Sequence, residues 1–117
     1  MVKNELTVKH WSNVEGGNGT PVFRMLLDDD ELPKNARIMA IAEFEPGESI
    51  GYHQHVNESE LYYILEGEST YQDDGEEYIV KAGTSTFCYE GHYHGIINTS
   101  DKKMKMLAVV LKENTDK

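Results

Sequence analysis

Five histidines are the residues of this 117-residue sequence best suited to metal chemistry, and two of them, His53 and His55, stand one residue apart. If their segment is a β-strand, residues i and i+2 point to the same side, so the two imidazoles lie together, with Cα atoms roughly 7 Å apart. That separation suits two ligands of one metal ion. Two ligands alone hold a divalent ion poorly, so we expect further donors from other segments.

Candidates for those donors occur later in the sequence. Glu60 opens the next apolar segment, and a hairpin that folds this segment beside the histidines would point Glu60 at them. Glu58 competes for the carboxylate role, but its offset favours a solvated position or a contact that supports a ligand. His94 opens an apolar segment after a glycine turn, which makes it the natural fourth donor. His92 has the same parity, and we weigh an exposed rim position against a fifth ligand or a proton shuttle.

The elements that must position these residues are predicted to be β-strands. Short segments rich in β-branched, aromatic and aliphatic residues are separated by Gly, Pro, Asn and Asp turns at a spacing of about 8–12 residues, which is typical of an all-β sandwich or barrel. In residues 60–65 both strand faces are largely apolar, as expected where one face lines a barrel and the other meets a second sheet or subunit. Asp74-Gly75 marks the tip of a hairpin. We expect a single domain over residues 1–117.

Composition narrows the classes of partner. The formal net charge is −10, from 21 acidic and 11 basic residues, and such a surface repels phosphate backbones and anionic membranes. We therefore expect neither nucleic acid nor membrane as a partner. No apolar segment approaches the length of about 20 residues that a membrane helix needs, and the N-terminus lacks an apolar signal-peptide core, so a cytoplasmic location is expected. Cys88 is the one cysteine, and we expect a buried, unreactive thiol.

The spacing of the candidate ligands resembles the two sequence motifs of the cupin family. The first motif is Gly, five residues, His-x-His, three or four residues, Glu, six residues, Gly. Its fixed positions are all matched here, by Gly47, His53, His55, Glu60 and Gly67. The second motif is Gly, five residues, Pro-x-Gly, two residues, His, three residues, Asn. It is matched here by Gly83, Gly91, His94 and Asn98.

The resemblance covers residues 37–111 well, with Tyr89 standing where the second motif has proline. It implies a double-stranded β-helix, or jelly-roll barrel, that is often a homodimer and carries one metal ion at its mouth. The residues that match the family's ligands are His53, His55, Glu60 and His94. Three imidazoles and a carboxylate suit Mn, Fe, Co, Ni, Cu or Zn better than Ca or Mg. Residues 1–36 would pack on this core or on a partner subunit.

The function implied by the resemblance is less specific, because cupins support many reactions. We expect a divalent metal ion to bind a small carboxylate, keto acid or sugar derivative at its open positions, in an enzyme of the dioxygenase, decarboxylase, isomerase or lyase type. The alternative is a binding or sensing module without turnover. The candidates for acid–base catalysis are Glu58, Tyr62 and His92. The candidates for contacts to the ligand are Arg24, Arg37, Tyr62 and Tyr89.

Overall fold

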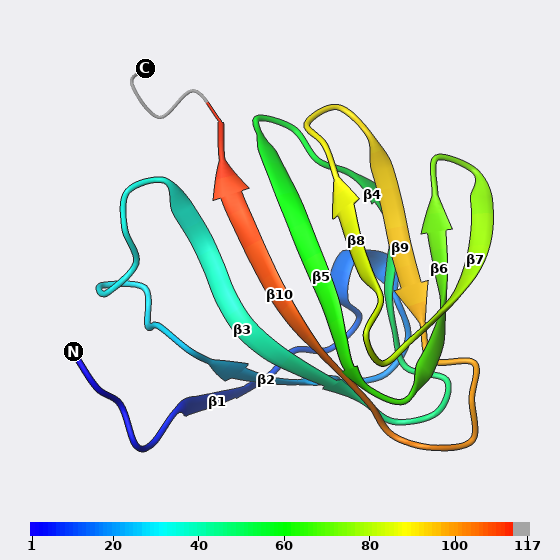
Figure 1. Cartoon of the computed structure of the whole chain (residues 1–117), viewed down its shortest axis with the longest axis horizontal. Helices are drawn as coiled ribbons and strands as arrows, with labels where there is room; N and C mark the ends of the chain where they lie inside the picture. The colour runs from blue at the N-terminus through cyan, green and yellow to red at the C-terminus, as the bar shows by residue number, and fades with distance from the viewer. Residues whose placement is uncertain (114–117) are drawn as a thin grey trace.

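Two antiparallel β-sheets face one another in the computed structural model, which describes residues 1–113 (Figure 1). The larger sheet has the strand order β1-β2-β3-β10-β5-β8 and the smaller sheet the order β4-β9-β6-β7. The strands of the larger sheet are β1 (Thr7–His10), β2 (Val22–Met25), β3 (Ala36–Phe44), β10 (Met104–Lys112), β5 (Glu58–Glu66) and β8 (Ser85–Cys88). Those of the smaller sheet are β4 (Ser49–Gln54), β9 (Tyr93–Ile97), β6 (Glu68–Asp73) and β7 (Glu76–Lys81).

The only other regular element in residues 1–113 is a 3₁₀ turn, η1 (Val14–Gly16), between β1 and β2. The prediction of an all-β chain is therefore confirmed. No helix in the described part of the chain is long and apolar enough to span a membrane.

The hydrophobic core lies between the sheets because each strand alternates its side chains between two faces. On β5, Tyr62 and Ile64 are fully buried, whereas Tyr63 and Leu65 lie on the outer face and are exposed. Strand β10 shows the same period. The core cluster is completed mainly by Phe23, Met25, Ala40, Ala42, Phe44, Ile50, Tyr71, Val80, Ile96, Met104, Met106 and Ala108.

The hairpin predicted from Asp74-Gly75 is present between β6 and β7. Asp73 pairs with Glu76, and both residues of the tip have positive φ, 48° at Asp74 and 89° at Gly75. A two-residue turn of this kind requires the left-handed conformation at both positions, which Asp and Gly tolerate best.

The prediction that a hairpin brings Glu60 beside His53 and His55 is wrong, because β4 and β5 do not pair with each other. Strand β4 pairs with β9, and β5 pairs with β10 and β8, so the segment that joins β4 to β5 crosses from one sheet to the other. Both strands carry apolar side chains that need burial. Two facing sheets bury these side chains between them, whereas a two-stranded hairpin by itself leaves one face exposed to solvent. Glu60 therefore approaches the histidines across the interior of the barrel.

The N-terminal segment packs on the same chain. Strands β1 and β2 extend the larger sheet beyond β3, and Trp11 packs on Phe23 with ring centroids 4.5 Å apart. The 3₁₀ turn lies directly against β4, where a Cβ on Gly51 would collide with the carbonyl group of Glu15. The lack of a side chain at Gly51 therefore allows η1 to approach the strand that carries His53 and leads into His55.

Candidate metal centre

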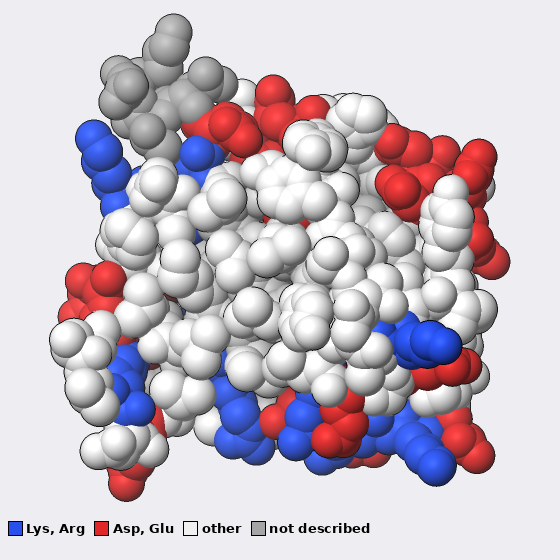
Figure 2. Space-filling model, in the orientation of Figure 1, with Lys and Arg blue, Asp and Glu red and all other residues white. Residues whose placement is uncertain are grey.

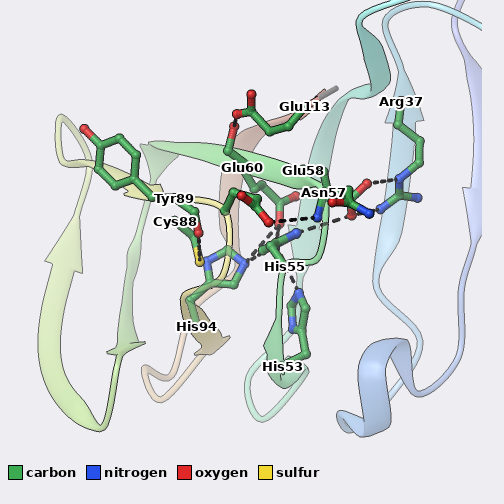
Figure 3. A network of polar contacts seen from close by, with 12 residues as sticks. Arg37, His53, His55, Asn57, Glu58, Glu60, Cys88, Tyr89, His94 and Glu113 are labelled. Atoms are coloured by element: carbon green, nitrogen blue, oxygen red, sulfur yellow. Dashed lines mark hydrogen bonds and ion pairs between the residues drawn. The ribbon is translucent and has the colours of Figure 1, made fainter. Parts of the chain in front are cut away.

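Four side chains from three strands and one connection converge inside the barrel. His53 comes from β4, His55 from the segment after it, Glu60 from β5 and His94 from β9, and one ligand atom of each lies within 4.8 Å of all the others (Figure 3). In the ladder between β4 and β9, His53 is directly opposite His94. His55, Glu60 and His94 are buried. The structure thus brings together the four residues that the sequence motifs predict.

The distances between the donor atoms match those expected around one ion. The Nε2 atom of His55 lies 2.9 Å from that of His94 and 3.3 Å from that of His53, and Glu60 Oε1 lies 3.0 Å from His55 Nε2. Two donors at right angles, each at about 2.1 Å from an ion, are separated by about 3 Å. Donors this close without a cation would place lone pair against lone pair.

The other ring nitrogen of each histidine is held by a hydrogen bond that turns Nε2 toward the centre. His53 Nδ1 donates to the carbonyl oxygen of Gly51 at 2.6 Å, and His55 Nδ1 donates to Glu58 Oε1 at 3.3 Å. His94 Nδ1 lies 2.9 Å from the hydroxyl group of Tyr71. Carbonyl and carboxylate oxygens only accept, so Nδ1 carries the proton in His53 and His55, and Nε2 keeps its lone pair.

The local electrostatics favour an ionised carboxylate. Burial raises the pKa of Glu60, but the close contacts of its carboxylate with the rings of His55 and His94 more than offset this effect and lower the pKa to about 2. Burial lowers the pKa of His94 below its ordinary value, so this ring is held neutral. Burial also lowers the pKa of His55, but Glu60 and Glu58 outweigh it and leave a net increase. An ionised carboxylate and neutral imidazoles are the forms that bind metals.

Arg37 and Glu58 form an ion pair behind His55. Arg37 Nε donates to Glu58 Oε2 at 2.7 Å, and Nη2 donates to Oε1 at 2.8 Å, so the contact is bidentate (Figure 3). The hydrogen bond from Arg37 lowers the pKa of Glu58. A shift of register opposite β10, where Val110 pairs with Ile38 and Leu111 with Ala36, skips Arg37. Such a bulge redirects a side chain, and here the Arg37 side chain lines a cavity beside the four clustered residues.

A cavity of about 230 Å³ opens beside the cluster. Its polar lining comes from His53, His55, Glu60, Glu58, Arg37, Gln54 and Glu15, and its apolar lining from Trp11, Val14, Phe23, Ile38, Ile50, Tyr62, Ala108 and Val110. We call it the metal cavity. Trp11, Val14, Glu15 and Phe23 belong to the N-terminal segment, from which the sequence suggests only Arg24 as a contact to the ligand.

The remaining candidates from the sequence lie in different places. Tyr62 lines the metal cavity and stacks on His94 with ring centroids 4.9 Å apart, and burial raises its pKa well above the ordinary value. Arg24 is outside this cavity and pairs with Glu43 at 2.6 Å. His92 is exposed and bonds to Asp74 at 2.5 Å, and Tyr89 is exposed beside it, with ring centroids 6.5 Å apart. Of these four residues, the structure brings Tyr62 alone to the cluster.

Cys88 is buried, as expected, and lies beside Glu60 in the ladder between β5 and β8. Burial raises the pKa of its thiol to about 12. The thiol is therefore protonated at neutral pH, and a thiol in that state is a poor nucleophile.

Comparison with known proteins identifies the family. The family model of the cupin domain matches residues 40–110, more than half of the chain. The chain belongs to the cupin family. The predicted double-stranded β-helix is confirmed by solved structures with the same fold, including a cupin protein from Bacteroides fragilis. A protein from Klebsiella pneumoniae with a double-stranded β-helix domain has a TM-score of 0.69 at 24% identity, covering 87% of this chain and 85% of that one, and it supports the fold alone.

Two matches to Thermotoga maritima are more similar in sequence. A protein named oxalate-binding protein is 37% identical over 108 residues, which span 92% of this chain and 89% of that protein. A crystal structure described as a predicted oxalate decarboxylase has a TM-score of 0.87 at 37% identity, covering 92% of this chain and 94% of that one. This cupin is thus similar to proteins whose descriptions name oxalate, as a bound ligand in one case and as the substrate of a predicted decarboxylase in the other.

Proposed function

We propose that this cupin binds a divalent first-row transition metal ion through His53, His55, Glu60 and His94. The convergence of three Nε2 lone pairs and a carboxylate oxygen within 4.8 Å is the observation that carries the proposal. A cation at their centre offsets the mutual repulsion of these donors, and each Nδ1 already has a polar partner. The donor set suits Mn, Fe, Co, Ni, Cu or Zn, with the choice set by supply.

The ligand that we propose for this metal is oxalate or a closely related small dicarboxylate. Four protein donors leave two positions of a six-coordinate ion open, and a bound ion draws electron density from the oxygen atoms that occupy them. The metal cavity, at about 230 Å³, lies at or below the lower limit of common ligand pockets and suits a small molecule. The 37% identical relative named for oxalate binding supports the choice of ligand.

Arg37 is the residue that we propose to orient the free carboxylate of the ligand. It lines the metal cavity, and its hydrogen bonds to Glu58 come from Nε and Nη2. A guanidinium group has five N–H donors in a plane, so the same side chain can hold Glu58 and present further N–H groups to a second carboxylate.

Calorimetric titration of oxalate tests this function directly. We expect wild-type protein loaded with Mn²⁺ to bind oxalate, and protein stripped with EDTA to bind it at least about tenfold more weakly. The variant His94→Ala should lose metal-dependent binding, and the matched control His92→Ala should keep it because His92 lies outside the cluster. Equal binding of oxalate by the loaded, stripped and His94→Ala proteins would contradict the proposal.

Turnover of the bound ligand is the second candidate function. Its support is Glu15, a carboxylate that lines the metal cavity from η1 and is separate from the four clustered donors. Decarboxylation of hydrogen oxalate gives carbon dioxide and formate, with a proton taking the place of the lost carboxyl group on carbon. We expect Glu15→Gln to retain oxalate binding and to release formate more slowly than wild type. If metal-loaded wild type binds oxalate but forms no formate, the turnover proposal is wrong and only the binding function remains.

We also propose that the protein is a homodimer formed through the outer face of the larger sheet. The cross-strand neighbours of two central β10 residues on this face are apolar: Ile41 and Tyr63 flank Leu107, and Met39 and Leu61 flank Val109. Figure 2 shows the corresponding face, over β3, β10, β5 and β8, largely free of charged side chains at its middle, with acidic and basic groups near its edges. A second copy presents the same apolar patch, so a two-fold pairing would cover both.

A further inference from the structure

A second cavity adjoins the metal cavity on the side of the N-terminal strands. It has a volume of about 400 Å³ and is formed by the end of β1, the loop between β2 and β3, the start of β3 and the end of β10. Three residues, Trp11, Arg37 and Ile38, line both cavities. The two spaces therefore meet along a shared wall that carries the one arginine of the metal cavity.

The charge of this second cavity is opposite to that of the protein. Among residues 1–113, four basic side chains line it, against one carboxylate, Asp29, although the chain as a whole has a formal net charge of −10. The four are Lys9, Lys34, Arg37 and Lys112, and of these Arg37 is also ion-paired with Glu58. Two further acids in the adjoining loop, Asp28 and Glu31, are paired with Lys3 at 3.3 and 2.5 Å. We call this space the cationic cavity.

The metal cavity by itself offers an incoming anion little long-range attraction. In the described part of the chain, its wall carries Glu15, Glu58 and Glu60 but a single cation, Arg37, and that cation is bonded to Glu58. Glu60 in the cluster and Glu15 in the cavity lining would offset the charge of a bound divalent metal ion. A dianion approaching a protein of net charge −10 is therefore repelled unless a local positive region guides it.

We propose that the cationic cavity is an anion-binding site that collects small carboxylates and passes them across the wall of Trp11 and Arg37 to the metal cavity. The identity of the carboxylate rests on the proposed function, whereas the anion site itself does not. Clustered charge of one sign in a concave space raises the local concentration of the oppositely charged ligand and its rate of association. Arg37, on the shared wall, is placed to contact the anion from both sides.

Quenching of tryptophan fluorescence tests the anion site, because Trp11 is the one tryptophan of the chain and lies on the shared wall. Iodide reports local positive charge, and neutral acrylamide reports exposure alone. We expect Lys9→Gln/Lys112→Gln to lower the iodide quenching constant by about twofold to fivefold with little change for acrylamide. The control Lys81→Gln/Lys102→Gln makes the same change of charge at positions that do not line the cavity, and should leave both constants near wild type.

The single variant Lys112→Gln guards against a change in the ring environment, because Lys9 lies over the Trp11 ring at 5.6 Å. It should also lower iodide quenching selectively. The anion site is refuted if both double variants lower iodide quenching equally, or if acrylamide quenching changes as much as iodide quenching.

Stopped-flow measurement of oxalate binding to metal-loaded protein tests the delivery step. We expect Lys9→Gln/Lys112→Gln to slow association by about threefold to tenfold at low ionic strength, and the gap to close at high salt. Association at the wild-type rate would overturn delivery. If oxalate binds no form of the protein, the proposed function fails, and the iodide result by itself then decides whether the cationic cavity attracts anions.

Discussion

The ring orientation of each of the three clustered histidines is fixed by a hydrogen bond to a different kind of partner. The partner of His55, Glu58, is itself held by a further side chain. Glu58 accepts a hydrogen bond from His55 Nδ1 while Arg37 holds both of its oxygens. The carboxylate thus fixes the orientation of the ring and the guanidinium group fixes the carboxylate. Contacts of this kind raise the affinity of a metal site without touching the ion.

The substitution Glu58→Gln tests this contact. The amide oxygen of the new side chain still accepts from His55, but the charge that holds Arg37 is gone, so we expect the affinity for Mn²⁺ or Co²⁺ to fall by about tenfold. Metal titrations of the variant and wild type give this ratio. Glu43→Gln is the matched control, since Glu43 is ion-paired with Arg24 outside the metal cavity. Equal metal affinity in all three proteins would remove Glu58 from the support of the site.

The pH dependence of metal affinity follows from the pKa of His55. Because this pKa lies above the ordinary 6.5 in the metal-free protein, a proton must leave His55 before a metal ion binds. Glu60, with a pKa of about 2, stays ionised and adds no slope. We expect metal affinity to fall as pH falls from above the pKa of His55 to below 6.5, with a slope that approaches about tenfold per pH unit at the acid end. Titrations across this range that give one constant affinity would contradict this assignment.

At this scale the sequence predicted the four clustered residues and gave a supporting contact as one role of Glu58, but it did not indicate the other supports. His53, His55, Glu60 and His94 follow from motif spacing alone. Arg37 was one of four candidates for contact to the ligand, and its role in holding Glu58 had no signal, because its position depends on a bulge opposite Val110 and Leu111 that no local pattern encodes. The partners Gly51 and Tyr71 had no signal either, since a backbone carbonyl and a buried phenol acquire this role only from tertiary packing.

The arrangement of the strands and turns also depends on buried polar side chains. Asn98, the last residue of the second cupin motif, is fully buried. Its amide donates to the carbonyl oxygens of Phe44 and Lys102 at 3.0 and 2.8 Å, and its Oδ1 accepts from Ser100. One side chain thus ties the end of β3 to the connection between β9 and β10. The motif identified Asn98 from spacing, and the structure gives it an architectural role.

We expect Asn98→Ala to lower the free energy of unfolding by about 2–4 kcal/mol, because buried carbonyl groups lose their donors. Urea denaturation measures the loss. Thr99→Ala removes a hydroxyl that bonds to Thr70 at an exposed position and should cost under about 0.5 kcal/mol. Similar small losses in both variants would mean that water satisfies the carbonyl groups freed by the loss of Asn98.

Element positions were predicted where turn chemistry is local and missed where pairing is long-range. The Asp74-Gly75 tip follows from the two residues that adopt positive φ. The supposed hairpin between β4 and β5 was wrong because a short connection is compatible both with a hairpin and with a crossing between sheets. The choice depends on β9 and β10, whose partners lie far away in the sequence.

In the whole molecule, the two faces of the larger sheet have different roles. The inner face builds the core and carries Glu60, and the outer face presents the apolar patch around Leu107 and Val109. The sequence indicated a strand apolar on both faces and hence a dimer, and it left open whether residues 1–36 pack on their own chain. Within residues 1–113 they pack on β3 and line both cavities.

Light scattering after size-exclusion chromatography tests the dimer. We expect wild type to have twice the chain mass and Leu107→Lys to approach the monomer mass, because a charge at the centre of the apolar patch must be desolvated on pairing. Ile79→Lys is the control, since Ile79 is also apolar and exposed but lies on β7 in the smaller sheet. A monomeric wild type, or a dimer unaffected by Leu107→Lys, would exclude this interface.

Titration of the metal-free protein with Co²⁺, followed by its visible absorption, tests the metal assignment most directly. We expect one Co²⁺ per chain, a spectrum that changes when oxalate is added, loss of the signal in His94→Ala, and full retention in His92→Ala. A protein that takes up no stoichiometric Co²⁺, or a His94→Ala variant that binds it as wild type does, would contradict the four-residue metal site.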